Sequence, residues 1–195
     1  MARSNVLKSL VLMGIPTYQI SLVILKQVTL LSSNYELYGD MSQRVFDTVR
    51  AYTADIEPYS IDEAFIALDG FVDVTSHCQQ IRHVVKSDTG IPVSIGIAST
   101  RTLAKVSNHI AKKKIDYRGV CYLSDDESLL IDALKQFPVG NVWGVGLRIA
   151  EKLQSLGIQT AWDLRQANVK QIKQQQQFSV VLEHTVLELR GTACI

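Results

Sequence analysis

Apolar residues recur every three or four positions between residues 33 and 53, and this spacing predicts an amphipathic helix. The apolar face consists of Tyr38, Met41, Val45, Val49 and Tyr52. Ser33 and Glu36 stand three residues apart where the pattern starts, which matches a capping box. We therefore expect a first helix that opens at Ser33 and ends near Thr53.

The next 70 or so residues mix helical and strand patterns. A second helix is predicted from Val74, Cys78, Ile81 and Val85, which share one face. Residues 93–98 alternate between apolar and small or polar side chains, as in a half-buried strand. A third helix is expected over residues 101–113 with Thr100 as its cap, and a last strand over residues 119–123. This order predicts an α+β fold with an antiparallel-containing sheet and helices on one face.

Turn-forming residues near position 125 mark a change to an all-helical remainder. We place a boundary there, which gives an α+β domain over residues 30–125 and a small helical domain over residues 126–195. Residues 1–29 form a separate leading segment, and a glutamine tract at residues 174–177 lies between predicted helices.

Composition adds the distribution of charge to this picture. The net charge is only +1, with 47% hydrophobic and 20% charged residues, as in a globular protein. Residues 36–69 hold eight acidic and two basic residues, whereas residues 101–120 hold six basic and one acidic. This separation suits a metal pocket beside a phosphate-binding face, although solvated helix faces also produce it. The three cysteines are widely spaced, the histidines lack zinc spacing, and no apolar run is long enough to span a membrane, so we expect a cytoplasmic protein.

Asp62 and Glu63 are adjacent carboxylates between two short apolar runs. Both runs suit strands, so the pair is expected at a hairpin tip. Charges beside an apolar sheet are costly unless they are neutralised, and a divalent cation held by oxygen ligands does so. The alternative is an ordinary solvated turn, which the general exposure of charged residues favours for a bare Asp-Glu pair.

The predicted third helix carries a basic stripe opposite its apolar residues. At 100° per residue, Arg101, Lys105, Asn108 and Lys112 lie on one side of it. Such a stripe suits phosphate binding, although a surface helix shows the same pattern.

Two glycines, Gly144 and Gly146, flank Val145 just before a predicted helix. Apolar–Gly–apolar–Gly before a helix is typical of a helix-hairpin-helix, in which backbone amides approach a DNA phosphate. Arg148 and Lys152 share a face of the following helix and add charge. An ordinary helical hairpin with glycine turns explains the pattern equally well. Thr160 and Asp163 predict the start of another helix.

Six segments resemble Y-family translesion DNA polymerases, and in particular the bacterial UmuC branch. They are Ser-Ser-Asn-Tyr-Glu-Leu-Tyr-Gly-Asp-Met-Ser at 32–42, Ser-Ile-Asp-Glu at 60–63, Ser-Ile-Gly-Ile-Ala-Ser-Thr-Arg-Thr-Leu-Ala-Lys at 94–105, Asn-His-Ile-Ala-Lys-Lys at 108–113, Val-Trp-Gly-Val-Gly at 142–146 and Leu-Glu-Leu-Arg-Gly at 187–191. The resemblance covers residues 32–195 in order. It implies a ferredoxin-like polymerase palm, followed by a helical thumb with a helix-hairpin-helix.

The resemblance also implies chemistry and partners. Asp62 and Glu63 would bind Mg²⁺ in a two-ion catalytic site, and Lys112 and Lys105 would contact the incoming triphosphate. DNA would be held by Arg101, Gly144, Val145, Gly146, Arg148 and Lys152. The implied partners are primer–template DNA, deoxynucleoside triphosphates, a UmuD-like dimer and the recombinase filament, in SOS repair and mutagenesis.

One departure from the family pattern bears on activity. The family opens with a strand that carries a first metal-binding Asp, and no Asp or Glu precedes Glu36 here. We therefore expect a relative that begins late, with residues 1–29 as a remnant of the fingers, and ends early. Its expected catalysis is weak. The alternative is a non-catalytic DNA- or partner-binding fragment, and a nucleotide cyclase ranks well behind because it does not explain the helix-hairpin-helix.

Overall fold

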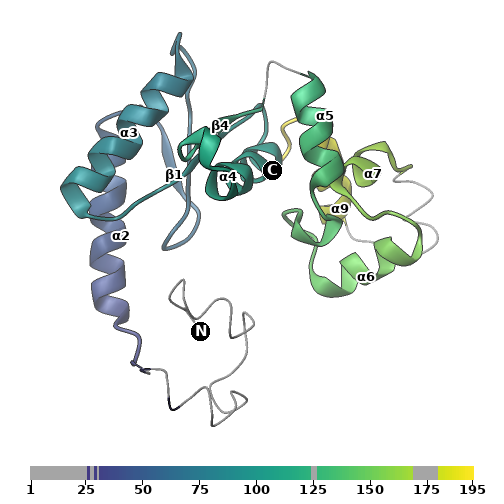
Figure 1. Cartoon of the computed structure of the whole chain (residues 1–195), viewed down its shortest axis with the longest axis horizontal. Coiled ribbons are helices and arrows are strands. Elements are labelled where there is room, and N and C mark those ends of the chain that lie inside the picture. The colour runs from purple at the N-terminus through teal and green to yellow at the C-terminus, as the bar shows by residue number, and fades with distance from the viewer. Residues whose placement is uncertain (1–25, 27–28, 30, 124–126, 169–179) are drawn as a thin grey trace. The chain divides into compact units, whose positions relative to one another are not determined.

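A computed structural model describes Lys26, Thr29 and residues 31–123, 127–168 and 180–195 (Figure 1). The chain divides into two compact units, residues 1–38 and 39–195, and the second contains nearly all of the described structure. The predicted fingers remnant, apart from Lys26 and Thr29, and the glutamine tract lie outside the described residues.

Helix α2 spans Tyr35–Arg50 and follows the predicted apolar spacing. Its start differs from the prediction, because the backbone N–H of Leu37 donates to Asn34 Oδ1 at 3.0 Å. Asn34 therefore caps the helix, and the capping box predicted at Ser33 and Glu36 is wrong. Asparagine is as good a cap as serine, and the sequence Ser-Ser-Asn offers both.

In the part of the chain that the structure describes, four strands of three residues each form two separate two-stranded sheets. Strands β1 (Ile56–Pro58) and β2 (Ala64–Ile66) pair antiparallel, with Glu57 opposite Phe65. Strands β3 (Ile95–Ile97) and β4 (Val120–Tyr122) pair parallel, with Gly96 opposite Cys121. The antiparallel pair agrees with the prediction, whereas the parallel pair was not predicted.

Helix α3 (Val74–Thr89) is capped by Asp73 and packs on both sheets. Its buried Ile81 and Val85 contact Ile56 and Ile66 of the first sheet, and its Cys78 contacts Ile97 and Val120 of the second. The two sheets thus share one covering helix although they share no strand (Figure 1).

Helix α4 (Arg101–Lys113) covers the opposite face of the β3–β4 sheet. Gly96 points toward it between Ile95 and Ile97, and the Ser107 hydroxyl donates to the Cys121 carbonyl at 2.6 Å. Side chains alternate across a strand, so Ile97 faces α3 whereas Gly96 faces α4. The expectation that helices lie on one face is therefore wrong for this sheet.

The Thr100 cap at the start of α4 is confirmed by its hydrogen bond from the Leu103 N–H. The 3₁₀ turn η3 (Ile115–Tyr117) leads on to β4.

The remainder of the described chain is helical, as predicted. It contains α5 (Glu127–Gln136), η4 (Val139–Asn141), α6 (Leu147–Ser155), α7 (Ala161–Gln166) and α9 (Val180–Leu189). The predicted helix start is confirmed, because Thr160 and Asp163 form a complete capping box. One apolar core joins α4 to these helices, so it crosses the boundary predicted near residue 125. None of the helices in the described ranges is long and apolar enough to cross a bilayer.

Glu188 joins α9 to the start of α4 and is fully buried. Its Oε2 accepts the backbone N–H of Thr102 at 2.9 Å, and its Oε1 accepts those of Cys194 and Ile195 at 2.8 and 3.3 Å. A buried carboxylate is tolerated when hydrogen bonds satisfy it, and the start of a helix favours negative charge. Glu188 thus fixes α9 against α4.

Candidate catalytic and DNA-binding site

Asp62 and Glu63 lie in the connection between β1 and β2, as predicted. The backbone N–H groups of Tyr59 and Ser60 both donate to the Glu63 carbonyl, at 2.9 and 3.0 Å, and thereby close the turn. The Ser60 hydroxyl donates to Asp62 Oδ1 at 2.8 Å. Asp62 is exposed and Glu63 is partly exposed. The turn thus presents both carboxylates to solvent at a strand junction.

Helix α4 supplies basic partners to this hairpin. Lys105 Nζ lies 2.9 Å from Glu63 Oε2, and Arg101 forms two contacts with the Glu57 carboxylate, at 3.1 and 2.5 Å. The basic stripe is therefore divided, because its first two cations are paired with the acidic hairpin. Lys112 at the far end is exposed and forms no ion pair with any described residue.

Three aromatic rings surround the Lys105 ammonium. Its Nζ lies 4.3 Å from the ring centroid of Tyr59, 4.9 Å from Trp143 and 5.7 Å from Phe65. The rings also contact one another, and Trp143 Nε1–H donates to the Tyr59 hydroxyl at 3.1 Å. We call Tyr59, Phe65 and Trp143 the aromatic box. No sequence pattern pointed to it, because its members lie up to 84 residues apart.

Asp62 and Glu63 provide two ligands suited to a divalent cation. Mg²⁺ prefers oxygen ligands and commonly binds through one or two carboxylates together with water and substrate phosphates. Among residues 31–123, 127–168 and 180–195, no group of three or more His, Cys, Asp or Glu side chains could hold a metal. The pair therefore fits part of a metal site, with the remaining ligands to come from elsewhere.

The two glycines of the Gly144–Gly146 turn have different structural roles. Gly144 has φ +83°, and a Cβ there would lie 2.9 Å from the Thr185 hydroxyl, so it is required for packing on α9. Gly146 forms the N-cap of α6, and no atom of the described residues lies within 4 Å of a Cβ built there. The start of α6 thus presents backbone N–H groups that suit a phosphate.

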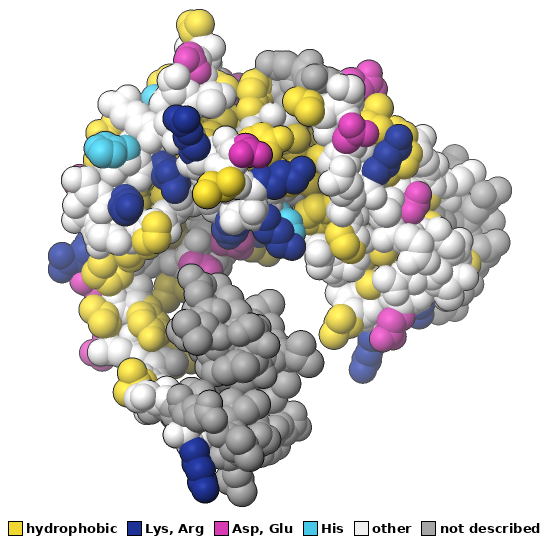
Figure 2. Space-filling view, viewed as in Figure 1, with side chains coloured by type: hydrophobic (Ala, Val, Ile, Leu, Met, Phe, Trp, Pro, Cys, Tyr) yellow, Lys and Arg dark blue, Asp and Glu magenta, His cyan; other side chains and the backbone are white. Residues whose placement is uncertain are grey.

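The other residues predicted to bind DNA fall into two groups. Arg148 and Lys152 are exposed on α6, as a DNA contact requires. Val145 is 6% exposed and packs in the core, so its side chain is not available to DNA. Figure 2 shows basic and acidic side chains interspersed on the face drawn, without one continuous positive surface.

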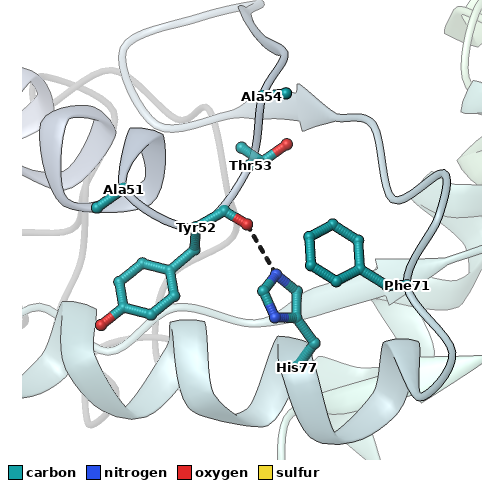
Figure 3. Close-up of a pocket in the computed structure, with 6 residues that line it drawn as sticks. All are labelled: Ala51, Tyr52, Thr53, Ala54, Phe71 and His77. Carbon is teal, nitrogen blue, oxygen red and sulfur yellow. Dashed lines mark hydrogen bonds between the residues drawn. The ribbon is translucent and has the colours of Figure 1, made fainter.

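A separate shallow hollow lies beside the end of α2. It has a volume of about 430 Å³ and is lined by Ala51, Tyr52, Thr53, Ala54, Phe71 and His77 (Figure 3). His77 Nε2 lies 2.8 Å from the Tyr52 carbonyl, and the His77 ring stacks on Phe71 with 3.9 Å between centroids. These contacts give the histidine a structural role.

Comparison with solved structures identifies the fold. The chain is similar to a DinB-family error-prone DNA polymerase from Sulfolobus solfataricus, with a TM-score of 0.74 and 20% identity over 96% of this chain and 58% of that chain. It is also similar to Dbh DNA polymerase in an insertion ternary complex, with a TM-score of 0.71 and 20% identity over 90% of this chain and 51% of that one. The fold is that of Y-family DNA polymerases.

Sequence comparison gives the family. Residues 3–109 match the impB/mucB/samB family, and the chain belongs to that family. ImpB of Salmonella typhimurium is 44% identical over 100% of this chain and 47% of its own length. UmuC of Salmonella typhimurium is 47% identical over 86% of this chain and 40% of its own length. The resemblance to the UmuC branch is thereby confirmed, and the chain spans about half the length of these curated relatives.

Proposed function

We propose that this chain provides the palm and thumb of an error-prone translesion DNA polymerase. The reaction is templated nucleotidyl transfer from deoxynucleoside triphosphates to a primer on damaged DNA. The observation that carries the proposal is the Asp62–Glu63 pair, exposed at a hairpin turn beside the basic helix α4 in a chain of this family.

The carboxylates of Asp62 and Glu63 are proposed to hold Mg²⁺ near the primer terminus. The ions of such a site lower the pKa of the attacking hydroxyl and neutralise the triphosphate. Lys112 is the stronger candidate for a triphosphate contact, because Lys105 is already paired with Glu63. Asp62 is more available to a cation than Glu63, which must first exchange its lysine partner.

The DNA duplex is proposed to contact the start of α6. The open surface at Gly146, with Arg148 and Lys152 nearby, suits a backbone phosphate, which gives affinity without sequence preference. Gly144 and Val145 support this turn through their packing and do not contact DNA with their side chains. Arg101 contributes only if it exchanges Glu57 for a phosphate.

The proposed setting is cytoplasmic SOS repair and mutagenesis, with a UmuD-like dimer and the recombinase filament as partners.

A second candidate is a non-catalytic DNA- or partner-binding protein. It is favoured by the pairing of Glu63 with Lys105 and by the lack of a third carboxylate beside the pair among the described residues. The two candidates share the DNA contact and differ in the chemistry at Asp62.

Primer extension by the purified chain, together with Mn²⁺ binding followed by electron paramagnetic resonance, separates them. We expect extension far slower than that of a full-length relative, and Mn²⁺ binding that Asp62→Ala abolishes. DNA affinity should be unchanged or slightly higher in this variant, because removal of an anion eases phosphate approach. Asp69→Ala removes an exposed carboxylate outside the pair and is the matched control. Mn²⁺ binding that is the same in both variants would refute the catalytic role of Asp62.

A further inference from the structure

The contacts of Lys105 extend from the acidic hairpin to the turn before α6. The side chain of Lys105 is 21% exposed and that of Glu63 is 38% exposed, so their ion pair is more shielded than the pair of Arg101 and Glu57, at 37% and 52%. Shielding strengthens an ion pair, and a cation over aromatic faces gains further attraction. Lys105 is therefore held by one carboxylate and by the aromatic box together.

Two members of the box belong to the hairpin, and the third belongs to the helical remainder. Tyr59 and Phe65 flank the acidic pair, whereas Trp143 precedes Gly144 and the start of α6. Trp143 is oriented by its N–H bond to Tyr59, and its carbonyl accepts the Thr185 hydroxyl at 3.4 Å. A displacement of the Trp143 ring within the aromatic box would therefore also displace the turn that contains Gly146.

Lys105 contacts both the Glu63 carboxylate and the Trp143 ring, and so connects the acidic pair to the turn before α6.

We propose that Lys105 is a positioning residue that couples the orientation of the Glu63 carboxylate to the Trp143 turn. When Glu63 leaves Lys105, the ammonium loses its anion and shifts within the box, and Trp143 moves with it. The proposal rests on the proposed function only where it concerns a divalent cation, since such a cation would draw Glu63 away from Lys105. Coupling between two sites is reciprocal, so a phosphate bound at the turn before α6 would also alter the affinity of Asp62 and Glu63 for the cation.

Tryptophan fluorescence tests this coupling. The chain has two tryptophans, so Trp162→Phe leaves Trp143 as the only reporter. In that background Glu63→Gln should shift the Trp143 emission to longer wavelength, because the loosened box exposes the ring. The same change should have no effect when Lys105→Met is already present, whereas Lys105→Arg, which keeps the charge, should restore part of the response. Glu57→Gln is the matched control. It breaks the other ion pair between the hairpin and α4, that of Glu57 with Arg101, whose Cζ lies 5.3 Å from the Phe65 ring centroid, and it leaves the pair of Glu63 with Lys105 in place.

Two results would overturn the proposal. One is an emission spectrum that Glu63→Gln leaves unchanged, and the other is an equal shift with and without Lys105. Circular dichroism of each variant separates these results from loss of the fold. In a second experiment Mg²⁺ should produce the same shift as Glu63→Gln. A Glu63→Gln shift that depends on Lys105, without a Mg²⁺ response, would support the coupling and count against the metal site of the proposed function.

Discussion

Gly96 in β3 lies directly against the backbone of Asn108 in α4. A Cβ at Gly96 would stand 2.0 Å from the Asn108 nitrogen and 2.3 Å from the Ala104 carbonyl oxygen. Backbone atoms cannot move aside as a flexible side chain can, so the strand and the helix approach this closely only because residue 96 is a glycine.

Gly96→Ala is therefore expected to destabilise the protein severely, by roughly 3 kcal/mol or more, because overpacking here displaces a helix. Gly39→Ala is the matched control. Gly39 lies inside α2, and no described atom outside its own helix lies within 4 Å of a Cβ there, so alanine should stabilise the protein by about 0.5–1 kcal/mol through its higher helix propensity. Urea denaturation measures both changes. Equal stability of the two variants would contradict the close packing of α4 on β3.

Glu188→Ala should also be strongly destabilising. It leaves the backbone N–H groups of Thr102, Cys194 and Ile195 without their carboxylate, at a cost of about 3 kcal/mol. Glu188→Gln keeps one acceptor oxygen and should lose less. Glu151→Ala, at an exposed position of α6, should change the free energy of unfolding by no more than about 0.5 kcal/mol. A Glu188→Ala variant as stable as Glu151→Ala would show that the buried carboxylate contributes nothing.

DNA binding should be weak, independent of sequence and sensitive to salt. A few phosphate contacts imply a slope of log affinity against log salt of about −2 to −4. Arg148→Ala and Lys152→Ala should each lower affinity for every sequence and reduce the slope by about 1. Fluorescence anisotropy between about 50 and 300 mM salt measures the slope. Arg50→Ala is the control, because Arg50 pairs with Asp47 on α2. Equal affinity at both salt concentrations would exclude phosphate contacts.

The three cysteines should react with iodoacetamide in a fixed order. Cys78 and Cys121 are buried, and burial raises the pKa of the Cys78 thiol to about 11 and also raises the pKa of Cys121. Cys194 is exposed, although desolvation and the nearby Glu188 carboxylate raise its pKa as well. Only the thiolate reacts, so alkylation should accelerate as pH rises, with Cys194 first and the buried pair only after unfolding. Peptide mass spectrometry of the native protein checks the order.

Local patterns predicted much of this fold. The apolar faces of α2, α3 and α4, the Thr100 cap and the Thr160–Asp163 capping box all depend on residues a few positions apart. The hairpin position of Asp62 and Glu63 follows from the flanking strands for the same reason. The α2 cap was misassigned because two adjacent residue types favour that position equally.

Long-range contacts were not predictable in this way. Lys105 and Arg101 form a basic stripe in the sequence, but their pairing with Glu63 and Glu57 joins residues 42 and 44 positions apart. Glu188 was noted only as part of a family motif, and its burial depends on residues in another helix. The two roles of Gly144 and Gly146 likewise depend on Thr185, which no spacing rule links to them.

The contact between Glu188 and Thr102 also sets an order of events during synthesis. The two residues are 86 positions apart, which at typical translation speeds of about 5–20 residues per second means a delay of roughly 4–17 s. Until Glu188 leaves the ribosome, the first turn of α4 lacks this acceptor and α9 cannot dock. The hairpin with Asp62 and Glu63 can form early, but α4, which supplies Lys105, gains the hydrogen bond from Glu188 only when α9 has been made.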